Sequence, residues 1–456
     1  MNNAEQIKSD ANSPGLASTA IFILLIAIPV ITNLSFGGVS TGSFAFITVL
    51  VGLIPFLWLV QTFRDSRVTA VLHPTQIAFA GLIVLGIFQL LPFAGSGVPD
   101  GVLTTGASNA LSVEPNATRL AVIKLFVFGV FFAAALTFID SRSRIKKLVT
   151  ALIIFGSAMA FFAILQSLSD PTTIYGITPA AQARPFGPYI NRHHFASFLV
   201  MMFAMALAPL VGGGTKRDKL VFFAIAVVLI GTGVIFAGSR GAFLSLVAVL
   251  SFLAVAFVLI NRNDSKTSSK SGRKPLIGSP ALLVGSTVGL MLALIIVAVW
   301  AGGEQEFLRG AAMQETGEDF STGRLHYWAV ALNIFAANPI IGSGLESFGV
   351  AFTRYDTWSG IYRVEHAHND YLQMLSDGGI VGLSFVLLFI FFLFRSALGT
   401  IRGTKDRFRR SAAVGALAGC FGVMAHSVVD FPLRTNANMF FFLLLAALTI
   451  RKIKKE

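Results

Sequence analysis

The sequence has few charged residues and a single cysteine. Only 12% of its 456 residues are Asp, Glu, Lys or Arg, and 55% are hydrophobic, whereas about a quarter of a soluble domain is charged. Cys420 lies inside an apolar run, so a disulfide framework and a cysteine-based metal site are both excluded. With a mean hydropathy of +0.75, the composition indicates an integral membrane protein.

Acidic residues are also missing where an early metal site would need them. The link 33–41, between the first two apolar segments, has no charged residue. His366 and His368 are two residues apart, so they do not face together on a helix, and no clean carboxylate triad accompanies them. We therefore predict a protein without a metal or other cofactor.

Apolar segments recur along the whole chain, and most are long enough to cross a hydrocarbon core of about 30 Å. We predict spans near residues 16–34, 42–60, 76–93, 120–139, 148–166, 195–212, 220–237, 242–260, 281–301, 378–394, 411–429 and 437–450. The first of these spans has no small-residue cleavage site, so we predict that it is a retained membrane anchor and not a removed signal peptide. The predicted fold is an all-α integral membrane protein of about twelve transmembrane helices. It forms one domain, 1–456, whose long outer loop, 302–377, holds short helices as a subdomain.

Basic residues gather on alternate links between these spans. If the N-terminus is inside, the inner segments hold 25 of the 35 Lys and Arg residues. This is the positive-inside bias, which predicts cytoplasmic termini and an outward-facing loop 302–377. Anionic membrane lipid accounts for the net charge of +13, and we predict no nucleic-acid partner.

The stretch 364–375 concentrates the chemistry-bearing residues at the end of this outer loop. It contains two histidines, an amide and two carboxylates directly before an apolar segment. A neutral histidine, with a reference pKa of about 6.5, can accept a proton from an incoming hydroxyl. His368 or His366 is therefore the candidate general base, and Glu365 or Asp370 could orient its ring.

Arginines on three other outer segments could reach the same place. Arg240 stands in a Gly-Ser-Arg-Gly turn that would hold its guanidinium rigidly, and a guanidinium fork matches phosphate geometry. Arg324 falls in the first turn of a short helix that Ser321 or Thr322 would cap, and helix N-termini favour anions. Arg192 and a neighbouring histidine either bind an anion or anchor the chain in the membrane interface.

Such a group of arginines around a histidine suits a lipid-borne polyanion. A diphosphate leaves more readily when cationic donors neutralise the charge that develops on it. Lys124 either extends to the outer headgroups or contacts an anionic ligand. Asp430 and Arg434, in the last outer turn, are predicted to pair with each other.

Five motifs in order resemble the O-antigen ligase and polysaccharide polymerase superfamily. They are Phe186-Gly187…Asn191-Arg192-His193-His194-Phe195-Ala196, Ser239-Arg240-Gly241, Gly323-Arg324-Leu325…Trp328, Pro339…Gly342-Ser343-Gly344…Phe348 and His368-Asn369-Asp370-Tyr371-Leu372…Gly378-Gly379…Gly382-Leu383. The resemblance implies a multi-pass glycosyltransferase of the bacterial inner membrane that works on its periplasmic side. Such enzymes move a glycan from undecaprenyl diphosphate to an acceptor hydroxyl, without nucleotide sugar or metal.

The resemblance also implies roles for particular residues. Arg240 and Arg324 match the family arginines that bind the diphosphate, and His368 matches the histidine that activates the acceptor. Further candidate substrate-binding residues are Arg192, His194, His366, Asn369 and Tyr371. Arg192 departs from the family pattern, which often has Asn-His at this point. Asp377 is expected to pack the helix or support the site.

Several alternatives stay open. The acceptor is the lipid A core in a ligase and another lipid-linked glycan in a polymerase, and the sequence carries no acceptor signature. A transporter of lipid-linked polyanions would also need many spans and outward arginines. It would place ionisable residues deep within spans, which the predicted spans largely lack.

Overall fold

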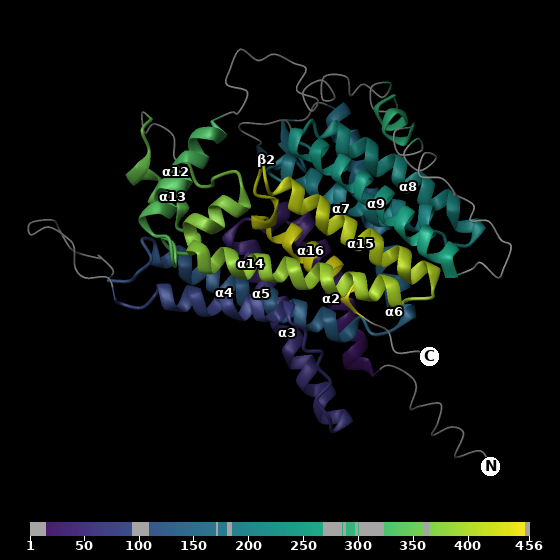
Figure 1. Ribbon diagram of the computed structural model, residues 1–456, viewed down its shortest axis with the longest axis horizontal. Helices are drawn as coiled ribbons and strands as arrows, with labels where there is room; N and C mark the ends of the chain where they lie inside the picture. Colours follow the sequence, from purple (N-terminus) through teal and green to yellow (C-terminus); the bar gives the residue numbers. More distant parts are fainter. Residues whose placement is uncertain are drawn as a thin grey trace, which may run out of the picture.

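The computed structural model describes residues 15–93, 109–169, 172–179, 185–267, 285, 289–296, 300, 323–358 and 364–451. The described chain is almost entirely helical (Figure 1). Its single sheet is an antiparallel pair, β1 (Thr173–Ile174) with β2 (Thr178–Pro179). The predicted all-α membrane class is confirmed.

Eleven of the twelve predicted spans coincide with helices. These are α2 (Leu16–Leu34), α3 (Thr41–Asp65), α4 (Thr75–Gln89), α5 (Pro115–Phe138), α6 (Arg142–Leu168), α7 (Arg192–Gly212), α8 (Arg217–Phe236), α9 (Arg240–Thr267), α14 (Asp370–Gly403), α15 (Arg407–His426) and α16 (Asn436–Ile450). Most of the remaining predicted span, 281–301, lies outside the described residues. So do residues 268–280 of the linker and residues 302–322 of the outer loop.

Among the described residues, eight helices are long and apolar enough to cross a membrane. Helices α4 and α16 have 15 residues each, about 22 Å at 1.5 Å per residue. That is less than the thickness of a hydrocarbon core. Helix α15 has 20 residues but is less hydrophobic, because its first turn contains Arg407, Arg409 and Arg410.

Successive helices alternate in direction, so the bundle has two distinct ends. At what we call the basic end, Arg144 donates to Ser18 and Arg142 pairs with Asp406. Opposite it is the histidine end, which carries His194, His368 and His426. The short helices α12 (Arg324–Ala337) and α13 (Phe348–Tyr355) lie together at the histidine end (Figure 1).

Helix α7 forms the centre of the bundle, whereas α3 lies on its rim. Every side chain of α7 from His194 to Pro209 is buried, but only Ile47, Val51 and Ile54 are buried on α3. Helix α15 packs closely on α7 through glycines: a Cβ on Gly415 would lie 2.9 Å from the Ala204 carbonyl oxygen. Small residues allow such close backbone approach between membrane helices.

A kink divides α14 where its membrane part begins. Gly379 has φ +63°, and the turn 339–344 inserts beside it. There Pro339 and Ile340 accept hydrogen bonds from the backbone N–H groups of Ile380 and Val381, which the break would otherwise leave unsatisfied. The kink thus holds the α12–α13 segment against the first turns of α14.

One detail of the predicted short helix is corrected. Helix α12 ends at Ala337, just before the predicted Asn338-Pro339 stop. Its N-cap, however, is Gly323 (φ +81°), which makes no side-chain cap bond. Ser321 and Thr322 lie outside the described residues.

Candidate functional site

A histidine–aspartate pair lies at the centre of the histidine end. His368 Nδ1 is 3.2 Å from Asp430 Oδ1. Because an ionised carboxylate can only accept, Nδ1 carries the proton and Nε2 keeps its lone pair. His368 is about one third exposed, while Asp430 is buried. This arrangement presents a basic nitrogen to a ligand and hides the group that orients it.

The loop before α14 fixes His368 in an unusual backbone conformation. His368 has φ +50°, in the left-handed region that residues other than glycine adopt at a cost of about 1–3 kcal/mol. The flanking residues are firmly bound: Ala367 N–H donates to Gln373 Oε1, and Asp370 N–H donates to the Ser427 carbonyl. Strain held this way is typical of functional sites.

Asp430 lies among three imidazoles. Besides His368, it has His194 Nε2 at 3.7 Å and His426 Nε2 at 3.8 Å. Burial alone would raise the pKa of Asp430, but the imidazoles of His194 and His368 outweigh it and hold the pKa well below its usual range. Asp430 is therefore a carboxylate, which can stabilise a protonated His368.

The Phe431 ring forms an apolar surface against which three imidazoles of the site pack. Its ring lies 4.3 Å from the ring of His366, 4.6 Å from His194 and 4.7 Å from His368. His366 Nδ1 accepts from Gln373 Nε2 at 3.1 Å. Burial, followed by Arg434, lowers the pKa of His366 to about 3. His366 is therefore neutral and offers its Nε2–H as a donor.

The other two imidazoles, those of His194 and His426, are held through their Nδ1 atoms. His194 Nδ1 is 2.7 Å from Thr435 Oγ1, and His426 Nδ1 contacts Ser197 Oγ. Their Nε2 atoms face Asp430 but make no hydrogen bond with the described part of the chain. Buried polar atoms are normally satisfied, so these nitrogens are available to a polar ligand.

The predicted arginines approach the same residues from two helix N-termini. Arg240 opens α9, and a Cβ on the adjacent Gly241 would lie 2.4 Å from His426 Nε2. Arg324 opens α12 close enough to His426 to act on its charge. Its Nε is buried and makes no hydrogen bond with a described residue. The structure thus brings Arg240, Arg324 and His368 around the His426–Asp430 group.

Aromatic residues of α12 and the chain after α13 complete this side. Tyr327 packs 6.0 Å from the ring of His368. His326 bonds Asp356 at 2.7 Å and stacks on Trp358 at 4.1 Å. The Trp358 backbone N–H and then His326 lower the pKa of Asp356. These contacts fasten the start of α12, and with it Arg324, over the site.

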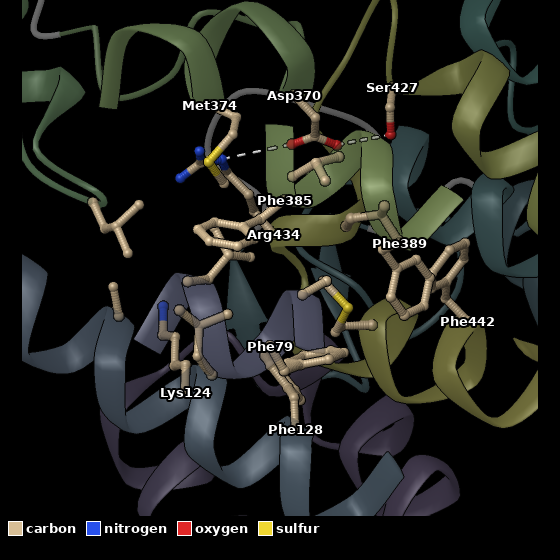
Figure 2. Close-up of a pocket in the computed structure, with 18 of the residues that line it drawn as sticks. Phe79, Lys124, Phe128, Asp370, Met374, Phe385, Phe389, Ser427, Arg434 and Phe442 are labelled. Carbon is tan, nitrogen blue, oxygen red and sulfur yellow. Dashed lines mark hydrogen bonds and ion pairs between the residues drawn. The ribbon is translucent and has the colours of Figure 1, made fainter. Parts of the chain in front are cut away.

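The predicted pairing of Asp430 with Arg434 is wrong. Arg434 instead binds three carboxylates: Glu346 at 2.7 Å, Asp377 at 3.3 Å and Asp370 at 3.6 Å. Figure 2 shows Asp370 between Arg434 and Ser427. The reason lies in the backbone. Helix α15 ends at His426, and the short 3-10 helix η2 (Pro432–Arg434) turns Arg434 away from Asp430.

The group that orients His368 also differs from the expectation. Asp370 is engaged by Ser427 and Arg434, and Glu365 lies against Gly349. Asp430 takes this role, although it is 62 residues away in the chain. Asp430 and His426 are the two site residues that were not predicted from the sequence to be part of the site. Their i, i+4 spacing at the end of an apolar segment was the available signal.

The remaining predicted residues lie at or near the site. Arg192 and His194 are in the first turn of α7. The Asn369 side chain caps α14 by accepting from the backbone N–H groups of Tyr371 and Leu372. The Tyr371 hydroxyl donates to the Met424 carbonyl. Contact of these four residues with a substrate stays a prediction.

The donor set is not arranged as a metal centre within the described ranges. No group of three or more His, Cys, Asp or Glu there has metal-ligand spacing. A cavity of about 230 Å³ adjoins the site between Phe36, Tyr189, His194 and Phe431.

Fold and site together define a multi-pass membrane protein with an Arg–His–Asp site at one end of its helices. Residues 225–387 match the family model described as O-antigen ligase. This match confirms the predicted resemblance to the O-antigen ligase superfamily over this part of the chain, which is less than half of its length. It spans the second half of α8, all of α9, α12 and α13, and the first half of α14, and so includes Arg240, Arg324 and His368 but not Asp430.

The matched family implies a ligase-like or glycosyltransferase-like role on lipid-linked glycans, with lipid acceptors, in a bacterial membrane. A search of curated proteins found no match to the chain.

Proposed function

We propose that this protein is an O-antigen ligase-type glycosyltransferase. It moves a glycan from undecaprenyl diphosphate to a hydroxyl of the lipid A core, without a metal, on the periplasmic face of the inner membrane. The observation that carries the proposal is the His368–Asp430 pair between the helix N-termini that bear Arg240 and Arg324.

The chemistry follows from these positions. His368 Nε2 takes the proton of the acceptor hydroxyl as its oxygen attacks the anomeric carbon of the glycan. The bond from that carbon to the diphosphate oxygen breaks, and the lipid diphosphate leaves as an anion. Arg240 and Arg324, with Arg192 as a third cation, neutralise that anion. Asp430 stabilises the imidazolium until it releases the proton to water or to the leaving group.

The membrane orientation is part of the proposal. The described links at the basic end carry most of the Lys and Arg residues, including Arg64, Lys146, Lys216 and Lys405. The positive-inside bias supports placing this end in the cytoplasm together with both termini. The histidine end then faces the periplasm, where a lipid-linked glycan and a glycolipid acceptor can meet.

Lipid extracts from cells lacking the gene test the function. Accumulated long polymer on the polyprenyl diphosphate is expected, because transfer to the final acceptor has failed. Accumulated single repeat units would instead establish the second candidate, an O-antigen polymerase, which the same family and site also support. Accumulation of neither would reject both.

Two further measurements test the site and the metal-free chemistry. Arg240→Ala and Arg324→Ala are each expected to abolish transfer while the protein stays in the membrane, as shown by immunoblotting of membrane fractions. Transfer by purified enzyme is expected to persist in excess chelator. Loss that added divalent metal reverses would reject the metal-independent mechanism.

A further inference from the structure

A second cavity, of about 210 Å³, lies inside the helix bundle next to the site. Helices α4, α5, α14, α15 and α16 form its walls. Most of the lining is apolar, and aromatic rings dominate its interior: Phe79, Phe128, Phe385, Phe389 and Phe442. From Ala121 to Phe128 the lining of α5 alone extends about 10 Å at 1.5 Å per residue. The shape and chemistry suit one hydrocarbon chain.

The two cationic groups of this cavity lie on one side of it. In Figure 2 the nitrogen atoms of Lys124 and Arg434 lie at one side, and Phe389 and Phe442 lie at the other. Arg434 is held by Glu346, Asp377 and Asp370. The Lys124 ammonium has no carboxylate within 4 Å among the described residues and makes no hydrogen bond with them. Lys124 is thus the cation available to a ligand in the cavity.

The cavity lies on the other side of α15 from the arginine site. Met424 and Ser427, which are three residues apart and share a helical face, line the cavity. His426 points away from that face, toward Gly241 and Asp430. Tyr371 donates to the Met424 carbonyl and closes the wall between α14 and α15. The cavity reaches the start of α14 at Asp370 and Tyr371, close to His368 in the chain, so a lipid in it approaches the site from the side opposite the arginines.

The charge at the polar part indicates which lipid fits. Three carboxylates surround Arg434, so a diphosphate there would meet like charge. Lys124, on the same wall, also acts on Glu346, and it supplies one further positive charge, which matches a single phosphate. The diphosphate donor therefore belongs with Arg240 and Arg324, and the cavity belongs with the other substrate.

We propose that this cavity binds an acyl chain of the phosphate-bearing glycolipid acceptor, and that Lys124 binds the acceptor's phosphate. The proposal rests on the proposed function, since it assigns the second substrate of the same site. It makes Lys124 a determinant of acceptor affinity and places the acceptor across His368 from the donor.

Photo-crosslinking tests the site without relying on transfer. The full chain in phosphatidylcholine nanodiscs would be irradiated with lipid A carrying a diazirine on one acyl chain, and adducts would be mapped by mass spectrometry. Adducts at Phe128 and Phe389 are expected, and excess unlabelled lipid A, but not undecaprenyl diphosphate, should remove them. Competition by undecaprenyl diphosphate, equal labelling by a diazirine phosphatidylcholine, or no adduct in the cavity would each overturn the proposal.

Matched variants separate the lysine from general effects. Lys124→Ala should reduce labelling about tenfold, and Lys124→Arg should restore most of it. Arg119→Ala, an exposed cation on the same helix outside the cavity, should leave labelling unchanged. Equal labelling of Lys124→Ala and the unmodified chain would reject the phosphate role.

A second pair of variants tests the cavity itself. Ala121→Leu should fill the space beside Lys124 and block labelling, whereas Gly129→Leu, on α5 where a Cβ meets nothing within 4 Å, should not. In transfer assays the acceptor KM should rise for Lys124→Ala, with the donor KM unchanged. Labelling without any transfer activity would leave the binding site standing and reject the proposed function instead.

Discussion

Two charged clusters lie four residues apart on the link between α15 and α16, and they are built in opposite ways. Asp430 is one acid among three imidazoles. Arg434 is one cation among three carboxylates. Histidine can gain or lose a proton near neutral pH, whereas arginine stays charged. The first cluster is therefore suited to proton transfer, and the second to holding the structure together.

The partners of each cluster support this difference. Arg434 joins the link before α13, the first turns of α14 and the start of α16. Burial favours neutral Glu346, but Arg434 and then Lys124 hold its pKa below the usual value. Burial likewise disfavours charged Arg434, yet Glu346 and its other carboxylates raise its pKa. This cluster is an ionic clamp in which all three carboxylates lie within 4 Å of one guanidinium, whereas two of the three imidazoles in the Asp430 cluster lie 3.7 and 3.8 Å from the acid.

The largest effect is expected from removing the base of the Asp430 cluster. His368→Ala should lower the transfer rate by about 10³-fold, because general base catalysis contributes about 10²–10⁴-fold. The rate would be measured with purified enzyme and lipid-linked glycan, and membrane abundance should match the unmodified protein. A fully active variant would remove His368 from the mechanism.

Removing the cation of the ionic clamp should mainly lower the stability of the fold. Arg434→Met removes the cation from the fully buried Asp377 and from the partly buried Glu346 and Asp370, and loss of one partner from a buried ion pair destabilises by about 3–5 kcal/mol. Thermal unfolding in detergent should show a clear decrease in Tm. Arg354→Ala, an exposed arginine on α13, is the control and should unfold like the unmodified protein.

If the ionic clamp stabilises the fold, a second substitution should restore part of the stability that Arg434→Met loses. Adding Asp377→Asn to Arg434→Met should recover part of the lost stability, because one unpaired charge is removed. If the double variant is less stable than the single one, the carboxylates are not the source of the loss.

A smaller effect on rate is expected from the acid of the first cluster. Asp430→Asn should lower kcat by about 10²-fold with little change in KM, because an amide can stabilise the wrong tautomer of His368. The pH profile of kcat should change as well. A change confined to stability, with an unaltered kcat and pH profile, would reduce Asp430 to a packing role.

The smallest effect concerns acid stability near His366. Its native pKa of about 3 lies below the unfolded value of about 6.5. The native state therefore binds fewer protons, and stability falls as the pH drops from 6.5 toward 3. The slope is at most about 1.4 kcal/mol per pH unit. His366→Gln should flatten the Tm-versus-pH curve in this range, and an unchanged slope would assign the acid sensitivity elsewhere.

Hydropathy and charge along the chain predict most of the fold. Eleven predicted spans coincide with helices, and the predicted start at 378 marks the Gly379 kink within α14. These features depend on segments of adjacent residues, which the sequence presents directly. The family motifs selected Arg240, Arg324 and His368 for the same reason.

Pairings between distant links could not be predicted in this way. Asp430 and Arg434 lie in the same outer turn of the chain, and they were predicted to bind each other. The end of α15 at His426 breaks the helical register between them. Asp430 instead meets His368, 62 positions away in the chain, and Arg434 meets Asp377, 57 positions away. Charge alone does not specify which of several acids a buried arginine will meet.

The sequence by itself determined the class of protein, the approximate spans, the asymmetry of charge between the two ends and the catalytic candidates. Each of these follows from local composition and from the cost of placing polar groups in hydrocarbon. The tertiary structure alone decided that Asp430 orients His368, that Arg434 closes an ionic clamp, and that an apolar cavity lies across α15 from the arginines. These depend on how non-adjacent helices pack, because packing brings together side chains whose separation in the chain carries no signal.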